Sequence, residues 1–191
     1  MKILNLYSGI GGNRTLWGDQ HEITSVELND KIANKYKLLY PNDNIIIADA
    51  HEYLLDNYKE YDFIWSSPPC QTHSRTNYFT QSIRKRPVYP SMKLYQEIIF
   101  LQNFYKGKFC VENVISYYEP LIKPTQIGRH YLWSNFNIPK IKQPKDDIGT
   151  MIKGHYNRAN KKLQEERNAV NSELGLHILN TALGIIKENK V

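Results

Sequence analysis

The sequence has few of the features that mark several common protein classes. Its 191 residues include two cysteines and six histidines, without Cys-x-x-Cys or His-Glu-x-x-His spacing, so no metal site is indicated. No apolar run approaches a membrane span, and the chain enters a strand-like segment at once, without the pattern of a signal peptide. We therefore expect an intracellular, cytoplasmic protein of a prokaryotic or viral host cell, with neither a metal nor a membrane partner.

The segments that are present predict one α/β domain. The chain is 41% apolar, has no repeats or low-complexity linkers, and alternates strand-like runs with helical stretches. This pattern predicts a sandwich around a mostly parallel sheet, formed by residues 1–191 as a single domain. The predicted strands are Ile3–Tyr7, Glu22–Val26, Asn44–Ala48, Tyr61–Trp65 and Lys108–Val111, and the predicted helices are Arg14–Trp17, Asp30–Leu39, Ala50–Asn57, Lys93–Tyr105 and Ser172–Lys187.

A cysteine follows the fourth predicted strand. Residues 66–71 read Ser-Ser-Pro-Pro-Cys-Gln, and the two prolines end the strand because they fix φ and remove backbone donors. Cys70 is therefore expected on a stiff loop at the carboxyl edge of the sheet, where open α/β folds bind ligands. A buried structural thiol is the simpler interpretation of a lone cysteine, and it is the one we adopt for Cys110, which lies within an apolar strand. For Cys70, three other segments favour a role in chemistry.

The ends of the first three predicted strands carry residues suited to a nucleoside. Residues Ser8–Gly12 read Ser-Gly-Ile-Gly-Gly, a loop that lets the backbone approach a ligand closely. Glu27 ends the second strand and is placed to accept both ribose hydroxyls, and Asp49 ends the third and suits an adenine amino group. Because Asn13 and Arg14 follow the glycines, the loop matches neither G-x-G-x-x-G nor a P-loop. A nucleoside pocket outside those two classes is predicted.

In this order, the segments resemble the motifs of the cytosine-C5 DNA methyltransferase family, which uses S-adenosylmethionine. The resemblance spans nearly the whole chain, and Pro-Pro-Cys-Gln followed by Glu-Asn-Val is its most specific part. The matching segments are Asn5–Gly12 for the cofactor loop, Val26, Glu27 and Asp49 for the ribose and adenine contacts, Ser67–Gln71 for Pro-Cys-Gln, Phe109–Val114 for Glu-Asn-Val, Gly128–Trp133 for the arginine strand and Arg167–Asn171 for the closing Asn-x-Val. Asn5 stands where the family has an acid, and His130 or Gly128 where it has a second arginine. The resemblance implies a Rossmann-like methyltransferase sandwich with S-adenosylmethionine as cofactor.

The resemblance also implies covalent catalysis by Cys70. Its thiolate would add to carbon 6 of cytosine, which makes carbon 5 nucleophilic toward the donated methyl group. Glu112 would hold the ring nitrogen N3 and donate a proton there, which requires a protonated carboxyl. Arg129 would bond the cytosine carbonyl or the Cys70 region, with a plain surface arginine as the alternative.

The other implied site residues form two groups. Those expected around the cofactor are Tyr7, Ser8, Gly9, Gly11, Gly12, Glu27, Leu28, Asp49, Ala50, Pro68, Asn168 and Val170. Those expected around the substrate are Ser74, Arg75, Arg84, Lys85, Arg86 and Asn113.

Charge points to a polyanionic partner. The net charge is +6, and residues 73–93 carry five Lys or Arg and no acid, with Tyr78, Phe79 and Tyr89 interleaved. Basic side chains neutralise phosphates and aromatic rings stack on bases, although a basic run is also compatible with a merely solvated loop. Family members that read a DNA sequence carry a separate target-recognition region between the arginine strand and the closing motif. In this chain only residues 135–166 lie between these motifs, which is too few for such a region. We therefore expect DNA as the partner, read by residues 73–93 or by a separate specificity subunit.

Three functions are compatible with the sequence. The first is a minimal cytosine-C5 methyltransferase that flips a base out of DNA. The second performs the same chemistry on a free cytosine nucleotide, single-stranded DNA or RNA. The third is a catalytically silent module that binds S-adenosylmethionine or nucleic acid, against which the intact Cys70 and Glu112 argue.

Overall fold

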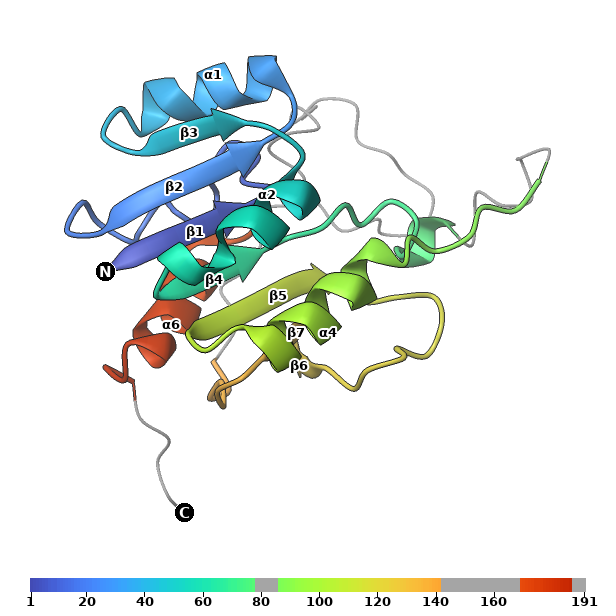
Figure 1. Cartoon of the computed structure of the whole chain (residues 1–191). Helices are drawn as coiled ribbons and strands as arrows, with labels where there is room; N and C mark the ends of the chain where they lie inside the picture. Colours follow the sequence, from blue (N-terminus) through green and yellow to red (C-terminus); the bar gives the residue numbers. More distant parts are fainter. Residues whose placement is uncertain (78–85, 142–168, 187–191) are drawn as a thin grey trace, which may run out of the picture.

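The computed structural model describes residues 1–77, 86–141 and 169–186, which build one sheet with helices on both faces (Figure 1). The strands are β1 (Lys2–Leu6), β2 (Glu22–Glu27), β3 (Asn44–Ile47), β4 (Phe63–Ser66), β5 (Lys108–Val114), β6 (Thr125–Ile127) and β7 (His130–Ser134). The helices are α1 (Asp30–Leu39), α2 (Ala50–Asn57), α4 (Lys93–Phe104) and α6 (Ser172–Ala182), and a short 3₁₀ turn, η1, covers Tyr58–Glu60.

The strand order places two loops side by side. The seven strands run β3-β2-β1-β4-β5-β7-β6, and all neighbours are parallel except those that pair with β7. This confirms the predicted α/β class with a mostly parallel sheet. The chain runs outward from β1 to β3 and then returns to form β4 on the other side of β1. Such a reversal opens a crevice beyond the carboxyl ends of the two central strands. The loops that follow β1 and β4 both begin there.

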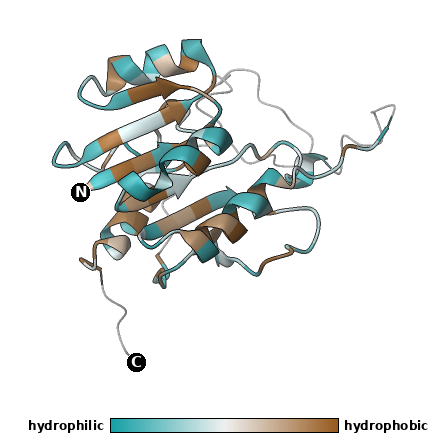
Figure 2. Cartoon of the chain, viewed as in Figure 1, coloured by the Kyte–Doolittle hydropathy of each residue, from teal (hydrophilic) through white to brown (hydrophobic). Residues whose placement is uncertain are grey.

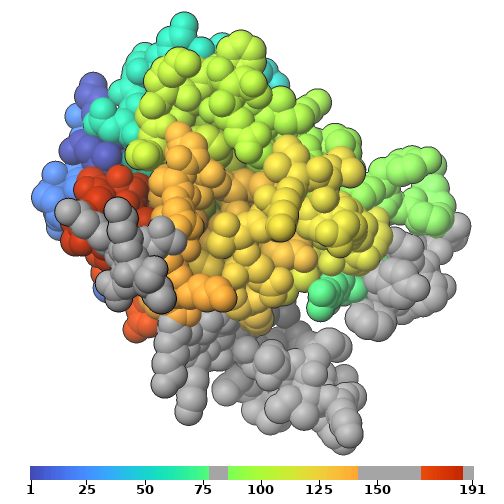
Figure 3. Space-filling model, turned by 90° about the horizontal axis from the view of Figure 1, so that it is seen from below, coloured from blue at the N-terminus to red at the C-terminus, as the bar shows by residue number. Residues whose placement is uncertain are grey.

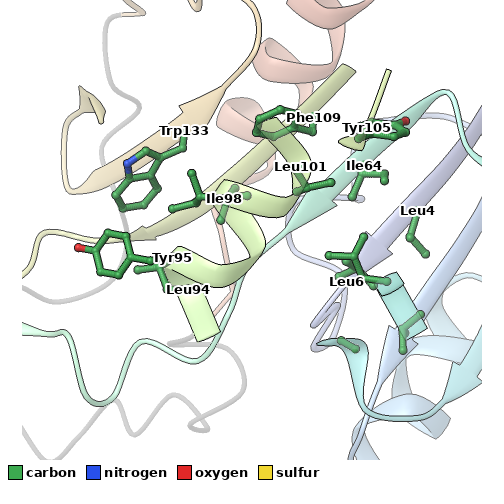
Figure 4. Close-up of a cluster of buried hydrophobic side chains, with 14 residues drawn as sticks. Leu4, Leu6, Ile64, Leu94, Tyr95, Ile98, Leu101, Tyr105, Phe109 and Trp133 are labelled. Carbon is green, nitrogen blue, oxygen red and sulfur yellow. The ribbon is translucent and has the colours of Figure 1, made fainter. Parts of the chain in front are cut away.

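Alternation of apolar residues along the strands creates two cores. Leu4 and Leu6 of β1 pack in one cluster with Ile98 and Leu101 of α4, as the close-up shows (Figure 4). Ile3 points to the other face and packs in a second cluster together with residues of α6. Each fully buried aliphatic side chain of this kind contributes about 1.5–3 kcal/mol. Figure 2 shows the same division, with apolar colour along the strands and polar residues on the outer helical surfaces.

Two helices begin and end where the sequence predicts. Asn29 precedes α1, and its side chain accepts from the backbone amides of the first turn, as does Asp49 before α2. The predicted helix to Lys187 is too long, because α6 ends at Ala182. Gly184 lies just beyond with φ of 72°, a left-handed conformation typical of a helix end, and its amide donates to Thr181 at 3.0 Å.

The predicted helix over Arg14–Trp17 is wrong. The segment forms turns in which the amide of Arg14 donates to the carbonyl of Gly11 at 3.0 Å. The Arg14 side chain is buried and its guanidinium donates to Asp43. This ion pair with a distant residue holds the segment in a turn, so no helix forms there. The predicted strand over Lys108–Val111 is too short, since β5 continues to Val114.

The segment after β7 lies beside α6, as the space-filling view shows (Figure 3). The ring Nε2 of His177 in α6 lies 2.8 Å from the carbonyl of Pro139 in this segment. Of the predicted recognition region 135–166, only residues 135–141 are among those described. Within the described ranges, no helix combines the length and the apolar character needed to cross a membrane.

Candidate active site

The loop that carries Cys70 is held by neighbouring strands. Asn113 of β5 donates from Nδ2 to the carbonyl of Pro68 at 2.9 Å, and both residues are buried. The indole of Trp65, at the end of β4, donates to Ser67 Oγ at 2.8 Å. The carbonyl of Cys70 accepts the amides three and four residues later, at 2.9 and 3.0 Å. The thiol is therefore presented from a fixed turn, as the two prolines predict.

Glu112 lies next to this loop. Val111 of β5 pairs with Ser66 of β4, so Glu112 is level with the first residue of the Cys70 loop. The residue is 6% exposed, and its Oε1 lies 2.7 Å from Nδ1 of His130 on the antiparallel strand β7. The pair brings a carboxyl group and a titratable imidazole to the carboxyl edge of the sheet.

Burial, followed by the negative charge of Glu112, raises the pKa of the Cys70 thiol. The neutral thiol is therefore favoured at neutral pH in the ligand-free protein. Glu112 is therefore close enough to Cys70 for its charge to act on the thiol.

The loop after β1 forms a cradle of backbone groups. Gly9 and Gly11 adopt φ of 54° and 81°, and a Cβ at Gly11 would lie 2.4 Å from the ring of Tyr40, so only glycine fits there. Glu27 accepts the amide of Gly9 through Oε2 at 3.0 Å and that of Asn29 through Oε1 at 2.9 Å. These bonds fix the carboxylate at the end of β2, where the sequence predicts a ribose contact.

The segment before α6 closes behind this cradle. A Cβ at Gly12 would lie 2.6 Å from the carbonyl of Val170 and 2.7 Å from the side chain of Ala169. The segment before α6 therefore approaches the loop after β1, and Gly12 and Val170, both predicted around the cofactor, are neighbours. Asn168, the other residue predicted there, lies outside the described residues.

Two polar side chains of the cradle region are available to a ligand. Ser8 Oγ is buried and has no hydrogen-bond partner among the described residues, so a bound molecule can supply one. Asp49 uses Oδ1 to cap α2, and its Oδ2 lies 3.4 Å from Lys93 Nζ. Burial works against ionisation, but backbone amides and the charge of Lys93 outweigh it and lower the pKa of Asp49. The side chain is therefore an anionic acceptor, as an amino group of a nucleobase requires.

A buried polar network holds the cradle from behind. It runs through Arg14, Asp43, Tyr36, Ser25, Asn5 and Asn13, each bonded to the next. Asn5 accepts from Asn13 at 2.8 Å and donates to Ser25 at 3.4 Å. An amide at position 5 can both donate and accept, whereas an ionised acid can only accept. This explains how the chain accommodates asparagine at that position.

Most of the predicted site residues gather at the carboxyl edge of the sheet. Those at or just beyond the ends of β1 to β5 are Tyr7, Ser8, Gly9, Gly11, Gly12, Glu27, Leu28, Asp49, Ala50, Pro68, Cys70, Glu112 and Asn113. Asn113 uses both polar groups of its side chain within the protein, since its Oδ1 also accepts the amide of Val114 at 3.0 Å. Leu28 is 68% exposed, and Arg75, Arg86 and Arg129 are exposed as well. Ser74 bonds Thr76 and forms a bridge to Ser116, and Arg84 and Lys85 lie outside the described residues.

A family model described as C-5 cytosine-specific DNA methylase matches residues 1–119. The chain belongs to this family. S-adenosylmethionine is accordingly its cofactor, and the residues that would hold it are those of the cradle together with Glu27 and Asp49. In the parts of the chain that the structure describes, no group of three or more His, Cys, Asp or Glu is placed to hold a metal ion.

Individual relatives match shorter stretches. A tRNA (cytosine(38)-C(5))-methyltransferase of Spodoptera frugiperda is 34% identical over 80 residues, which cover 39% of this chain and 24% of that protein. The chain thus spans about a quarter of the length of this curated relative. A crystal structure of a Spodoptera frugiperda DNMT2 mutant is 28% identical, with a TM-score of 0.41, and covers 59% of this chain and 35% of that one. A methyltransferase of Agrobacterium tumefaciens, described as SAM-dependent, is 16% identical, with a TM-score of 0.45 and coverage of 62% and 40%.

Sequence reasoning missed the residues that support this methylase site. Arg14 and Asp43 are 29 positions apart, and no local pattern announces their ion pair. Glu97 leaves a clearer signal, because it lies at helical spacing among Leu94, Ile98 and Leu101 on the apolar face of α4. An acid at such a position predicts buried hydrogen-bond partners.

Proposed function

We propose that this chain transfers a methyl group from S-adenosylmethionine to carbon 5 of cytosine in DNA through a covalent bond to Cys70. The observation that carries the proposal is the meeting of Cys70 with the Glu112–His130 pair at the carboxyl edge of the sheet, one strand from the glycine cradle. A thiol, a buried acid and a nucleoside cradle are the parts that this reaction requires.

The protein residues divide the reaction into steps. The Cys70 thiol first loses its proton to water. The resulting thiolate forms a bond to carbon 6 while the proton of the Glu112–His130 pair passes through Glu112 to N3, so the adduct is neutral and the electron pair of the former double bond between carbons 5 and 6 becomes available at carbon 5. When bound, the cofactor supplies a methyl group on a sulfonium as the electrophile for carbon 5. The proton on carbon 5 then leaves to water, the bond from Cys70 to carbon 6 breaks, and the N3 proton returns to the pair.

Basic and aromatic side chains near the loop support a polynucleotide substrate. Arg75 and Arg86 are exposed, and Tyr89 has 92% of its surface exposed, so phosphate pairing and base stacking are both available. Specificity would come from residues 73–93 or from a separate subunit. We propose that residues 1–191 serve as one catalytic domain.

RNA is the second candidate substrate. It is favoured by the relative whose name specifies a tRNA cytosine, which matches 39% of this chain. The chemistry at Cys70 is the same for both polymers, so discrimination would rest on contacts outside the base pocket.

A labelled methyl-transfer assay tests the proposal. Duplex DNA, single-stranded DNA, tRNA and deoxycytidine nucleotides are compared, and the products are identified by nucleoside mass spectrometry. We expect 5-methylcytosine in duplex DNA, with loss of activity in Cys70→Ser and normal activity in Cys110→Ser. Methylation of tRNA or a nucleotide alone would overturn the DNA assignment, and binding of S-adenosylmethionine without any transfer would indicate a silent module.

A covalent test addresses the mechanism separately. DNA containing 5-fluorocytosine should become bonded to Cys70 in the presence of the methyl donor, because the fluorine cannot leave as a proton does. If the covalent bond between 5-fluorocytosine DNA and Cys70 does not form in the wild-type protein, under conditions in which normal DNA is methylated, Cys70 is not the nucleophile.

A further inference from the structure

Glu97 is a fully buried acid that the mechanism above does not use. It lies in α4, and none of its surface is exposed to solvent. Leu94, Ile98 and Leu101 of the same helix pack into the core beneath β1 and β4 (Figure 4), which fixes the position of the helix. A carboxylate costs several kcal/mol to bury unless it is paired and hydrogen-bonded, so its partners define its role.

Three partners satisfy Glu97, and each belongs to a different part of the site. Tyr7 OH donates to Oε1 at 2.5 Å, Ser66 Oγ donates to Oε2 at 2.6 Å, and His51 Nδ1 lies 3.1 Å from Oε1. Tyr7 is the first residue after β1 and leads into the glycine cradle. Ser66 is the last residue of β4 and leads into the Cys70 loop. His51 is in the first turn of α2, two residues after Asp49.

The two loop contacts are made at the points where each loop leaves its strand. Tyr7 has φ of 55°, and it alone among the described non-glycine residues has a positive φ, a conformation that costs free energy and requires support from its surroundings. The hydrogen bond to Glu97 supplies such support. Ser66 is fully buried, and its hydroxyl fixes the strand end from which Ser67 and the prolines start.

His51 balances the charge of the acid. The hydrogen bond between the ring of His51 and the Glu97 carboxylate, which accepts it, raises the pKa of His51 against the opposing effects of burial and Lys93. An imidazolium at this position offsets the buried carboxylate and ties it to the helix that Asp49 caps. The cluster therefore joins four elements, β1, α2, β4 and α4, at one buried carboxyl group.

We propose that Glu97 is a positioning residue that couples the cofactor cradle to the Cys70 loop. A displacement of Tyr7, next to the cradle, also changes the hydrogen bond between Glu97 and Ser66, next to the Cys70 loop, because the two residues bond the two oxygens of one carboxyl group. Occupancy of the cradle thereby sets the reactivity of Cys70. The inference rests on the proposed function for the meaning of the two loops, but it is measurable without methyl transfer.

The first test separates the two arms of the cluster. Tyr7→Phe removes one hydrogen bond on the cradle side and should raise the Kd for S-adenosylmethionine, measured by calorimetry, by about tenfold. Ser66→Ala removes one on the Cys70 side and should leave that Kd within about twofold while it changes the iodoacetamide alkylation rate of Cys70 by at least about threefold. Gln96→Ala, at an exposed position of the same helix, is the control and should change neither quantity.

The second test measures the coupling itself. In the wild-type protein, saturating S-adenosylmethionine should change the alkylation rate of Cys70, and the alkylated protein should bind the cofactor with a Kd different from that of the unmodified protein. Glu97→Gln keeps the size of the side chain but removes its charge, and it should abolish most of this mutual effect. Gln96→Ala should retain it.

The outcomes distinguish this inference from the proposed function. If Tyr7→Phe and Ser66→Ala lower the melting temperature equally but change neither the cofactor Kd nor the alkylation rate of Cys70, Glu97 has only a structural role and the inference is overturned. Full coupling in Glu97→Gln would also overturn it. Intact coupling in a wild-type protein that methylates no polynucleotide would leave the inference standing and remove the proposed function.

Discussion

Replacement of Asn113 by alanine should slow methyl transfer, because Asn113 holds the loop that carries Cys70. Asn113 is 2% exposed, and its side chain donates to the carbonyl of Pro68 at 2.9 Å, two residues before Cys70. Its removal leaves a buried carbonyl unpaired, which costs about 1–3 kcal/mol. If the loop relieves this cost by moving, the productive arrangement becomes less populated by the same free energy. The expected fall in the rate of transfer is about 5- to 150-fold.

Single-turnover kinetics with saturating cofactor measures this effect, and calorimetry should show a cofactor Kd within about twofold of wild type. Asn103→Ala is the matched control, because Asn103 also donates from Nδ2 to a backbone carbonyl, that of Ile99 at 2.7 Å, but on the exposed surface of α4. Asn113→Asp should be at least as slow as Asn113→Ala, since a carboxylate cannot donate to Pro68. A single-turnover rate for Asn113→Ala that equals that of Asn103→Ala would refute the reasoning.

Three further changes test other contacts. Glu112→Gln removes the charge that helps to raise the pKa of Cys70, so that pKa should fall and alkylation of Cys70 at neutral pH should become faster. Methyl transfer should drop at least about 100-fold in the same variant. Slower alkylation would contradict the effect of Glu112 on the thiol. Arg14→Met leaves the buried carboxylate of Asp43 without its cation and should lower the free energy of unfolding by about 3–5 kcal/mol, measured by urea titration. Asp19 is an exposed partner of the same guanidinium, so Asp19→Asn should lower the free energy of unfolding by less than about 1 kcal/mol. Ser8→Ala should leave the melting temperature unchanged, since the hydroxyl has no partner among the described residues, but should weaken cofactor binding about two- to tenfold; unchanged affinity would place the cofactor elsewhere.

Local patterns predicted the elements that local interactions form. Helices α1 and α2 begin at side-chain caps and were predicted to the residue, because Asn29 and Asp49 bond the first turn that follows them. Strands β1 to β5 were predicted from apolar runs, and their parallel pairing was predicted from the helical stretches expected between them, although turns replace the helix expected between β1 and β2. Gly184 was an available stop signal that the predicted end of the last helix overlooked.

Contacts between distant segments were not predictable in the same way. Arg14 was assigned to a helix because short-range reasoning cannot include Asp43, whose buried carboxylate fixes the arginine in a turn. The pairing of His130 with Glu112 depends on the register of β5 and β7, in which Val114 lies opposite His130. The motif order predicts that these residues lie at one edge of the sheet, and the sheet register determines which side chains are neighbours there.

The hydrogen bond between Trp65 and Ser67 has a practical consequence. The indole of Trp65 donates to Ser67, the first residue of the Cys70 loop, at 2.8 Å, and its ring centroid lies 6.0 Å from that of Trp17. Indole emission responds to the loss of such a bond and to entry of water. Any movement of the loop should therefore change the protein's natural ultraviolet emission, which offers an optical sensor of loop opening without an attached dye. Replacing Trp17 and Trp133 by phenylalanine would leave Trp65 as the sole emitter of its kind in the chain.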